Sequence, residues 1–189
     1  MVISHSRIGA VVCALGISAA ASANFGSVSW TLGQFGADGV TGDFMPLGAT
    51  YAMLGPAAVG GTGSLTSQQM SLTSGNIGAR GITGYFATAT FSGTVSVNWS
   101  FSSVDDPQYE AVGFVQNNQF RVVGNTNGTS GVMNFNVTAG ESFGLAVMTT
   151  DGLFGAGTAT FTNFSYVPAP GALALLGLAG VSGRRRRAR

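Results

Sequence analysis

The acidic residues at positions 105, 106 and 110 form the only local cluster of carboxylates in the sequence. Asp105 and Asp106 are adjacent, and Glu110 follows four residues later. Carboxylate oxygens are the hard ligands that Ca²⁺ prefers, and a neighbouring loop that carries Asp151 could complete a calcium site. The run Asp-Asp-Pro is equally typical of a turn. Two interpretations therefore stay open, a calcium site that pins loops and a plain surface turn.

A second chemistry open to carboxylates is glycoside hydrolysis, which needs two of them on facing elements. The chain has seven Asp and Glu residues, but most lie in apparent turns, so we favour the turn interpretation. The only histidine and the only cysteine are His5 and Cys13, and lysine is absent. Both residues lie in the N-terminal leader described below, so the folded part lacks nucleophile–base pairs and ordinary zinc ligands. We therefore predict that the protein is not an enzyme and binds no cofactor, calcium excepted.

Aromatic side chains offer a third chemistry, because their faces stack on the apolar faces of sugar rings. Tyr51 and Tyr109 lie beside turn signals and are the best candidates for such a surface. Trp30 and Trp99 share their strand faces with aliphatic residues, so we expect both tryptophans in the core. The tyrosines make a carbohydrate-binding module an alternative function.

These candidate residues are separated by short segments with strand periodicity. The clearest is 94–101, where Val95, Val97, Trp99 and Phe101 alternate with polar residues, as a half-buried strand requires. Similar patterns recur at 28–32, 132–137 and 158–166. Outside the two ends, no long window has helical periodicity. Many short strands with Gly, Asn and Ser turns predict an all-β fold, a single antiparallel β-sandwich, with a jelly roll as first choice.

Two local features refine this prediction. Asn117 and Asn118 separate two strand-like segments and favour a two-residue hairpin, because asparagine tolerates positive φ. The segment 62–74 is expected to be a strand with Leu65, Met70 and Leu72 inward, while 37–63 is poorly patterned.

The N-terminal 23 residues have the order of a secretory signal peptide. A charged start that ends at Arg7 precedes an apolar run, and Ala21-Ser22-Ala23 is a small-residue cleavage site. The mature chain is expected to begin at Asn24. Cys13 lies inside the apolar run rather than after it, so lipidation is not expected.

The last 24 residues combine three different features. Val167-Pro168-Ala169-Pro170 is followed by an apolar run at 171–181 and a basic cluster. Prolines hold an extended backbone, so we expect a processing enzyme to read this segment outside any fold. The apolar run favours a membrane anchor helix, and the arginines favour the cytoplasmic side. The basic cluster consists of Arg184, Arg185, Arg186, Arg187 and Arg189.

This tail resembles the PEP-CTERM sorting signal of bacterial exported proteins, in a variant with Ala169 where the family most often has Glu. The resemblance covers only the tail. It implies processing by an exosortase-type membrane enzyme after transient anchoring. An ordinary anchor that is never cut is the alternative interpretation.

The sequence thus predicts a signal peptide at 1–23, a β-sandwich domain at 24–165 and a sorting segment at 166–189. The domain carries Arg80 and Arg121 against seven acids, a net charge of about −5 (two minus seven), which excludes nucleic acid as a partner. We expect export across the inner membrane, a temporary tail anchor, and delivery to the cell surface or extracellular matrix, with exopolysaccharide as the partner. A glycosidase is the less favoured alternative.

Overall fold

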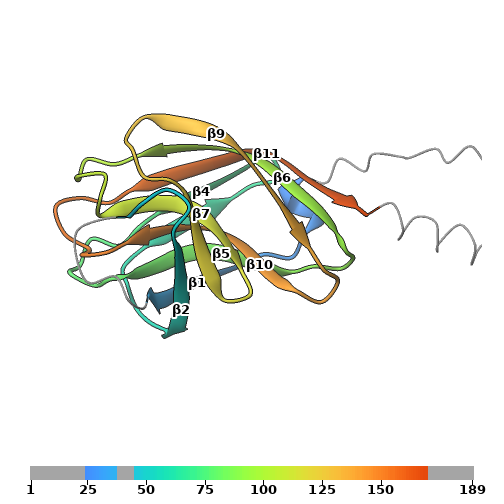
Figure 1. The fold of residues 1–189 in the computed structure, drawn as a ribbon, viewed down its shortest axis with the longest axis horizontal. Coiled ribbons are helices and arrows are strands. Elements are labelled where there is room, and N and C mark those ends of the chain that lie inside the picture. Colours follow the sequence, from blue (N-terminus) through green and yellow to red (C-terminus); the bar gives the residue numbers. More distant parts are fainter. Residues whose placement is uncertain (1–23, 38–44, 170–189) are drawn as a thin grey trace, which may run out of the picture.

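The computed structural model describes residues 24–37 and 45–169, and these residues fold almost entirely into β-strands (Figure 1). A 3-10 turn, η1, spans Phe25–Ser27. The strands are β1 (Thr31–Ala37), β2 (Thr50–Pro56), β3 (Thr62–Leu65), β4 (Gln69–Thr73), β5 (Gly81–Thr88), β6 (Gly93–Ser102), β7 (Glu110–Gln116), β8 (Gln119–Gly124), β9 (Thr129–Val137), β10 (Ser142–Thr149) and β11 (Thr158–Pro168).

All the strand pairs are antiparallel and belong to two sheets. One sheet has the order β3-β4-β11-β6-β9, and the other has the order β1-β2-β8-β7-β10-β5 and closes through the pairing of β1 with β5. Within them, β4-β11-β6-β9 and β5-β10-β7-β8 are the two four-stranded sheets of a jelly roll. The predicted all-β sandwich of jelly-roll type is therefore confirmed, with β1, β2 and β3 as additions.

The alternation in β6 produces the expected faces. Val95, Val97, Trp99 and Phe101 are all buried, whereas the polar residues between them face outward. β6 lies between β11 and β9 in its sheet, and its inner face packs toward the second sheet. Period-two polarity thus decides which face of the strand enters the core.

The main core between the sheets is rich in aromatic rings. Phe114 of β7 stacks on Phe135 of β9 across the two sheets, with ring centroids 4.4 Å apart. Phe143 is fully buried and packs edge-on against Trp30 at 5.5 Å. Full burial of a side chain of this size stabilises the fold by about 2–3 kcal/mol. As expected, both tryptophans pack in or against this core; Trp99 is 9% exposed.

A second, smaller core belongs to the closed sheet. Ile82, Ala146 and Met148 of β5 and β10 meet Phe120 of β8 and Met45, all almost fully buried. The alternate faces of β5 and β10 therefore serve different cores, one between the sheets and one inside the closed sheet. Strands buried on both faces explain the continuous apolar character of β10.

The predicted hairpin at Asn117-Asn118 is confirmed. It joins β7 to β8, and the two asparagines have φ values of 53° and 58°, which is the geometry of a type I′ turn. The expected single strand at 62–74 is wrong. Thr66 accepts hydrogen bonds from the amides of Gln68 and Gln69 and breaks the segment into the hairpin β3–β4.

The strand order gives the sandwich two distinct ends. The first and last described residues lie at one end, which we call the tether end (Figure 1). The connections β4–β5, β6–β7, β8–β9 and β10–β11 lie at the opposite end, which we call the loop end. β11 continues through Pro168, three residues past the expected domain boundary at 165. Within 24–37 and 45–169, no helix is long and apolar enough to cross a membrane.

Candidate functional site

Glu110, the first residue of β7, lies fully buried beneath the loop end. Its Oε2 accepts a hydrogen bond of 2.6 Å from the Ser74 hydroxyl, and Ser74 Oγ accepts one of 2.9 Å from the Gly157 amide. Within the described part of the chain, Oε1 is buried and has no hydrogen-bond partner. The β4–β5 and β10–β11 connections thus converge on one acidic side chain, which the sequence analysis had assigned to a local cluster of carboxylates.

Burial raises the pKa of Glu110 to about 7. Desolvation is the largest cause, and the charge of Asp105 adds to it, while hydrogen bonds from Ser74, Thr149 and Gly157 lower the pKa. An added Cβ at Gly157 would lie 2.7 Å from Oε2, so glycine is needed where this loop passes the carboxyl group. A carboxyl group enclosed in this way pins loops and is shielded from a substrate.

The other two acids of the cluster differ from Glu110 in exposure and in hydrogen bonding. Asp105 Oδ1 accepts a 2.7 Å hydrogen bond from the Asp106 amide, and burial raises the Asp105 pKa, with smaller contributions from the charges of Asp151 and Asp106. Asp106 is exposed. Among the described residues, no three His, Cys, Asp or Glu side chains are arranged to hold a metal ion. The structure therefore does not bring Asp105, Asp106 and Glu110 together as one ligand set.

The two candidate tyrosines lie apart. Tyr51 pairs with Phe120 beside the β7–β8 turn and packs against the smaller core, and burial raises its pKa. Tyr109 directly precedes Glu110 at the other end of β7, and its carbonyl accepts a 2.8 Å hydrogen bond from the Thr150 amide. The structure places them in no common surface.

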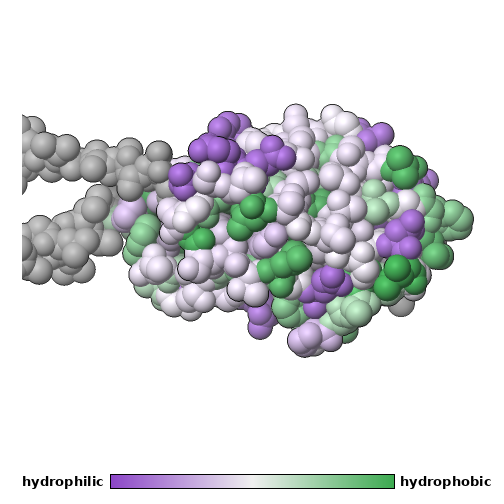
Figure 2. Space-filling view, turned by 180° about the vertical axis from the view of Figure 1, so that it is seen from behind, coloured by the Kyte–Doolittle hydropathy of each residue, from purple (hydrophilic) through white to green (hydrophobic). Residues whose placement is uncertain are grey.

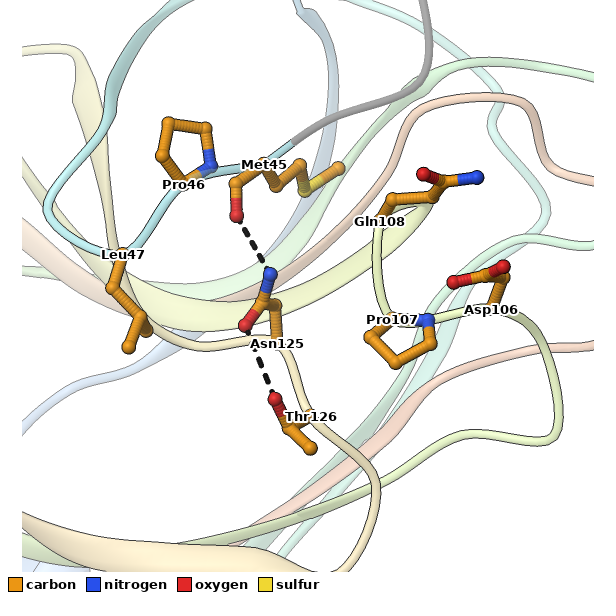
Figure 3. Close-up of a pocket in the computed structure, with 8 residues that line it drawn as sticks. All are labelled: Met45, Pro46, Leu47, Asp106, Pro107, Gln108, Asn125 and Thr126. Carbon is orange, nitrogen blue, oxygen red and sulfur yellow. Dashed lines mark hydrogen bonds between the residues drawn. The ribbon is translucent and has the colours of Figure 1, made fainter.

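A groove at the loop end, missed by the sequence reasoning, brings three distant segments together (Figure 3). Its volume is about 460 Å³. No short motif could reveal it, because its walls come from the segment before β2 and from the β6–β7 and β8–β9 connections. The lining residues are Met45, Pro46, Leu47, Asp106, Pro107, Gln108, Asn125 and Thr126.

One wall of the groove is fixed by a hydrogen bond, and the other carries polar side chains without hydrogen-bond partners among the described residues. Asn125 Nδ2 donates a 2.6 Å hydrogen bond to the Met45 carbonyl, which fixes the β8–β9 connection to the segment before β2. In the described residues, no hydrogen bond engages the carboxylate of Asp106 or the amide of Gln108. Pro107 lies between these two residues in the sequence, and Pro46 lies on the opposite wall of the groove (Figure 3). Asp106 and Gln108 can bond hydroxyl groups beside these apolar rings.

Exposed apolar side chains surround this end of the molecule. Val104 is 86% exposed and Phe154 is 81% exposed, and Ile77 and Leu153 are also exposed. Figure 2 shows apolar residues gathered at the end away from the grey termini. Large apolar residues on loop tips are costly to solvate, so the loop end differs in character from the polar sheet faces.

At the tether end, the sorting segment is partly folded. Val167 and Pro168 pair with Thr94 and Gly93 of β6, and the Ala169 amide donates a 2.8 Å hydrogen bond to the Ser92 carbonyl. The expectation that this segment lies outside any fold is therefore wrong for its first three residues. Strand β6 extends far enough to pair with them, and Pro168, which lacks a donor, ends the strand.

The remaining residues of the predicted signal peptide and sorting segment that were named as site residues lie outside the described part of the chain. They are Ala21 and Ala23 of the cleavage site, Pro170, and the basic cluster 184–187 with Arg189. Asn24, the expected first mature residue, is exposed, and its carbonyl accepts a 3.0 Å hydrogen bond from the Ser27 amide.

Comparisons with known proteins add little to this geometry. No protein-family model and no curated protein matches the chain. Among solved structures, it is similar to the enzymatically active domain of tailspike protein 4 of bacteriophage CBA120. The identity is 12% and the TM-score 0.29, over 73% of this chain and 19% of the length of that one. A similarity at this level leaves the function to be argued from the residues.

Proposed function

We propose that this protein is exported, is held for a time by its C-terminal tail, and then acts as a non-enzymatic component of the cell surface or extracellular matrix. In this proposal an exosortase-type enzyme processes the tail near the Val167–Pro170 motif, and the basic cluster keeps the chain oriented in the membrane. The folded domain contacts exopolysaccharide.

The observation that carries the proposal is the separation of the two ends. The tail leaves the domain at the tether end through β11, whereas the groove and the free side chains of Asp106 and Gln108 lie at the loop end. A tethered domain with this layout presents its groove away from the attachment point. Hydroxyl-bonding groups beside proline rings suit a neutral sugar, because the domain is net acidic and Asp106 would repel an anionic one.

The absence of a base–nucleophile pair from the sequence of the domain supports a binding role over a catalytic one. Glu110 has the pKa of a general acid, but it is enclosed by Ser74, Thr149 and Gly157. A specific carbohydrate-binding module remains the alternative, and a carboxylate-dependent glycosidase is less favoured. Turnover of the host polysaccharide that Asp106→Asn abolishes would support the glycosidase instead.

The processing part is tested by intact mass. Membrane-bound and released protein from the native cell are compared, and we expect the released form to end within or near residues 167–170. A released form that still ends in Arg189 contradicts processing. A reporter fused after Ala169 that stays in the cytosol contradicts export.

The binding part is tested with released protein and the extracellular polysaccharide of the host. Gln108→Ala and Asp106→Ala are each expected to weaken binding about tenfold, the loss of one or two hydrogen bonds. Gln119→Ala, an exposed glutamine beside the β7–β8 turn and outside the groove lining, is the matched control and leaves binding unchanged. If Tyr51→Ala or Tyr109→Ala weakens binding while the groove variants do not, the aromatic alternative holds.

A further inference from the structure

The carboxyl-terminal end of β11 is held differently from its beginning. Residues 158–162 pair with both β4 and β6. The register shifts between Thr162 and Ser165, where Asn163 has a φ of 52°, and the described pairing from Ser165 to Pro168 is with β6 alone. This terminal segment is therefore a short ribbon bonded along one side.

Tyr166 anchors the strand just before the sorting motif. Its ring is buried and stacks on Phe91 with centroids 4.1 Å apart. Its hydroxyl donates a hydrogen bond to the Phe91 carbonyl and accepts one from the Phe91 amide. The fold is thus firmly fixed up to residue 166, and only 167–169 lie between this anchor and the rest of the tail.

In residues 167–169 the side chains are at least partly accessible, whereas the backbone is paired to the neighbouring strand. Val167 is 37% exposed and borders a groove of about 560 Å³ that runs past Ser92, Thr94 and Asn136. The backbone at 167–169 is paired with Ser92, Gly93 and Thr94. An enzyme can therefore contact the side chains in the folded protein, while the backbone remains paired to a neighbouring strand.

We propose that processing of the tail requires residues 167–169 to unpair from β6, so that the end of β11 controls when the protein is released. This inference rests on the proposed function. In the cleavage step a nucleophile, water or an enzyme side chain, adds to a motif carbonyl carbon, the C–N bond breaks, and the departing nitrogen takes up a proton. A paired strand cannot enter a cleft that surrounds that bond, so local opening precedes cleavage.

A reversible crosslink tests this requirement. Thr94 and Val167 are register partners with exposed side chains, and neighbouring strand positions lie within reach of a disulfide. We expect oxidised Thr94→Cys/Val167→Cys protein to remain unprocessed in the native cell, and reduction of the cells with dithiothreitol to restore release. The length of the C-terminus is read from intact mass.

The matched control crosslinks the same two strands away from the motif. Ser100→Cys/Thr160→Cys joins another register pair of β6 and β11, and this variant should be processed at the wild-type rate when oxidised. Equal processing of the oxidised 94/167 variant overturns the unpairing requirement while leaving processing itself intact. If wild-type protein is never cut, the proposed function fails and the inference fails with it.

Substitution of Gly93 should have the opposite effect to the 94/167 crosslink, because it loosens the end of β11 instead of fixing it. A Cβ at Gly93 would lie 2.2 Å from the Val167 carbonyl oxygen, so Gly93→Ala pushes the end of β11 from the sheet. Relative to wild type, we expect this variant to be processed faster. Its hydrogen exchange should rise more at the Val167 and Ala169 amides than at the Ala159 amide. Gly55→Ala, whose Cβ would meet nothing within 4 Å, is the control. Unchanged exchange and processing in Gly93→Ala would count against the inference.

Discussion

The tether end and the loop end of this jelly roll are built from the same strands but differ in how the backbone and the side chains are held. At the tether end, tight turns and the Tyr166 anchor keep the backbone paired into the sorting motif. At the loop end, long connections expose apolar tips such as Phe154 and enclose the acidic side chain of Glu110. The contrast is that the last described strand is held by backbone pairing at one end, whereas a buried carboxyl group is enclosed beneath the connections at the other.

The largest effect that separates the ends should come from the pH dependence of Glu110. Its folded-state pKa of about 7 exceeds the ordinary value of 4.5, so the folded protein binds the proton more tightly than the unfolded chain. The free energy of unfolding therefore falls as pH rises from 4.5 to 7, by about 3 kcal/mol from this group.

Urea denaturation at pH 5 and pH 8 measures this change. In Glu110→Gln, which keeps the shape without the charge, the difference between the two pH values should shrink by most of that amount. Asp105, whose pKa is also raised, contributes in the same direction and remains in the variant. An identical pH dependence in both proteins would show that Glu110 is not enclosed.

Filling the space beside Glu110 is the next largest perturbation. Gly157→Ala would place a Cβ 2.7 Å from Glu110 Oε2 and 3.0 Å from the Phe101 ring, and overpacking of this kind costs about 2 kcal/mol. Thermal unfolding compares this variant with Gly55→Ala, where the added methyl group meets open space. Equal melting temperatures would contradict the close packing at the loop end.

At the tether end, removal of one hydroxyl group should have a smaller effect. Tyr166→Phe keeps the stacked ring but leaves the Phe91 amide and carbonyl without this partner. We expect a loss of about 1.5 kcal/mol. Hydrogen exchange should rise most at Phe91 and at 167–169, while the amides around Glu110 keep their protection. A uniform rise throughout the chain would mean that the two ends are not separate units.

The smallest effect is expected at the exposed tip. Phe154 has a φ of 59° and its side chain is 81% exposed, so it has little packing to lose and a backbone that asparagine adopts more easily. Phe154→Asn should keep or raise the free energy of unfolding, by about 0.5 kcal/mol at most. A clear loss in denaturant unfolding would reveal a packing role for this tip.

The parts of the fold that could be predicted are those determined by local pattern. The alternation from Val95 to Phe101 gives the faces of β6, and Asn117-Asn118 gives the β7–β8 turn, because both depend only on neighbouring residues. Many short strands without helical segments between them predicted the sandwich class with a jelly roll as first choice, whereas the order of the strands depends on pairing between distant segments. The Thr66 turn was missed because its hydrogen bonds interrupt a segment whose composition reads as one strand.

The parts that could not be predicted depend on contacts distant in sequence. Glu110 is adjacent to turn residues, and its burial depends on Ser74, 36 positions earlier, and on the passage of Gly157. The groove joins the segments around Met45, Asp106 and Asn125, which share no motif. The folded start of the tail depends on Gly93, which permits the backbone of β11 to approach closely.

The closed sheet has a consequence for behaviour at high protein density. Because β1 and β5 complete that sheet, the whole strands with only one neighbour in the described chain are β3 and β9. β3 has four residues, whereas β9 has nine and follows the full length of β6. Unsatisfied backbone groups on an edge strand recruit further strands. Copies at high protein density would therefore be expected to join first along β9, edge to edge.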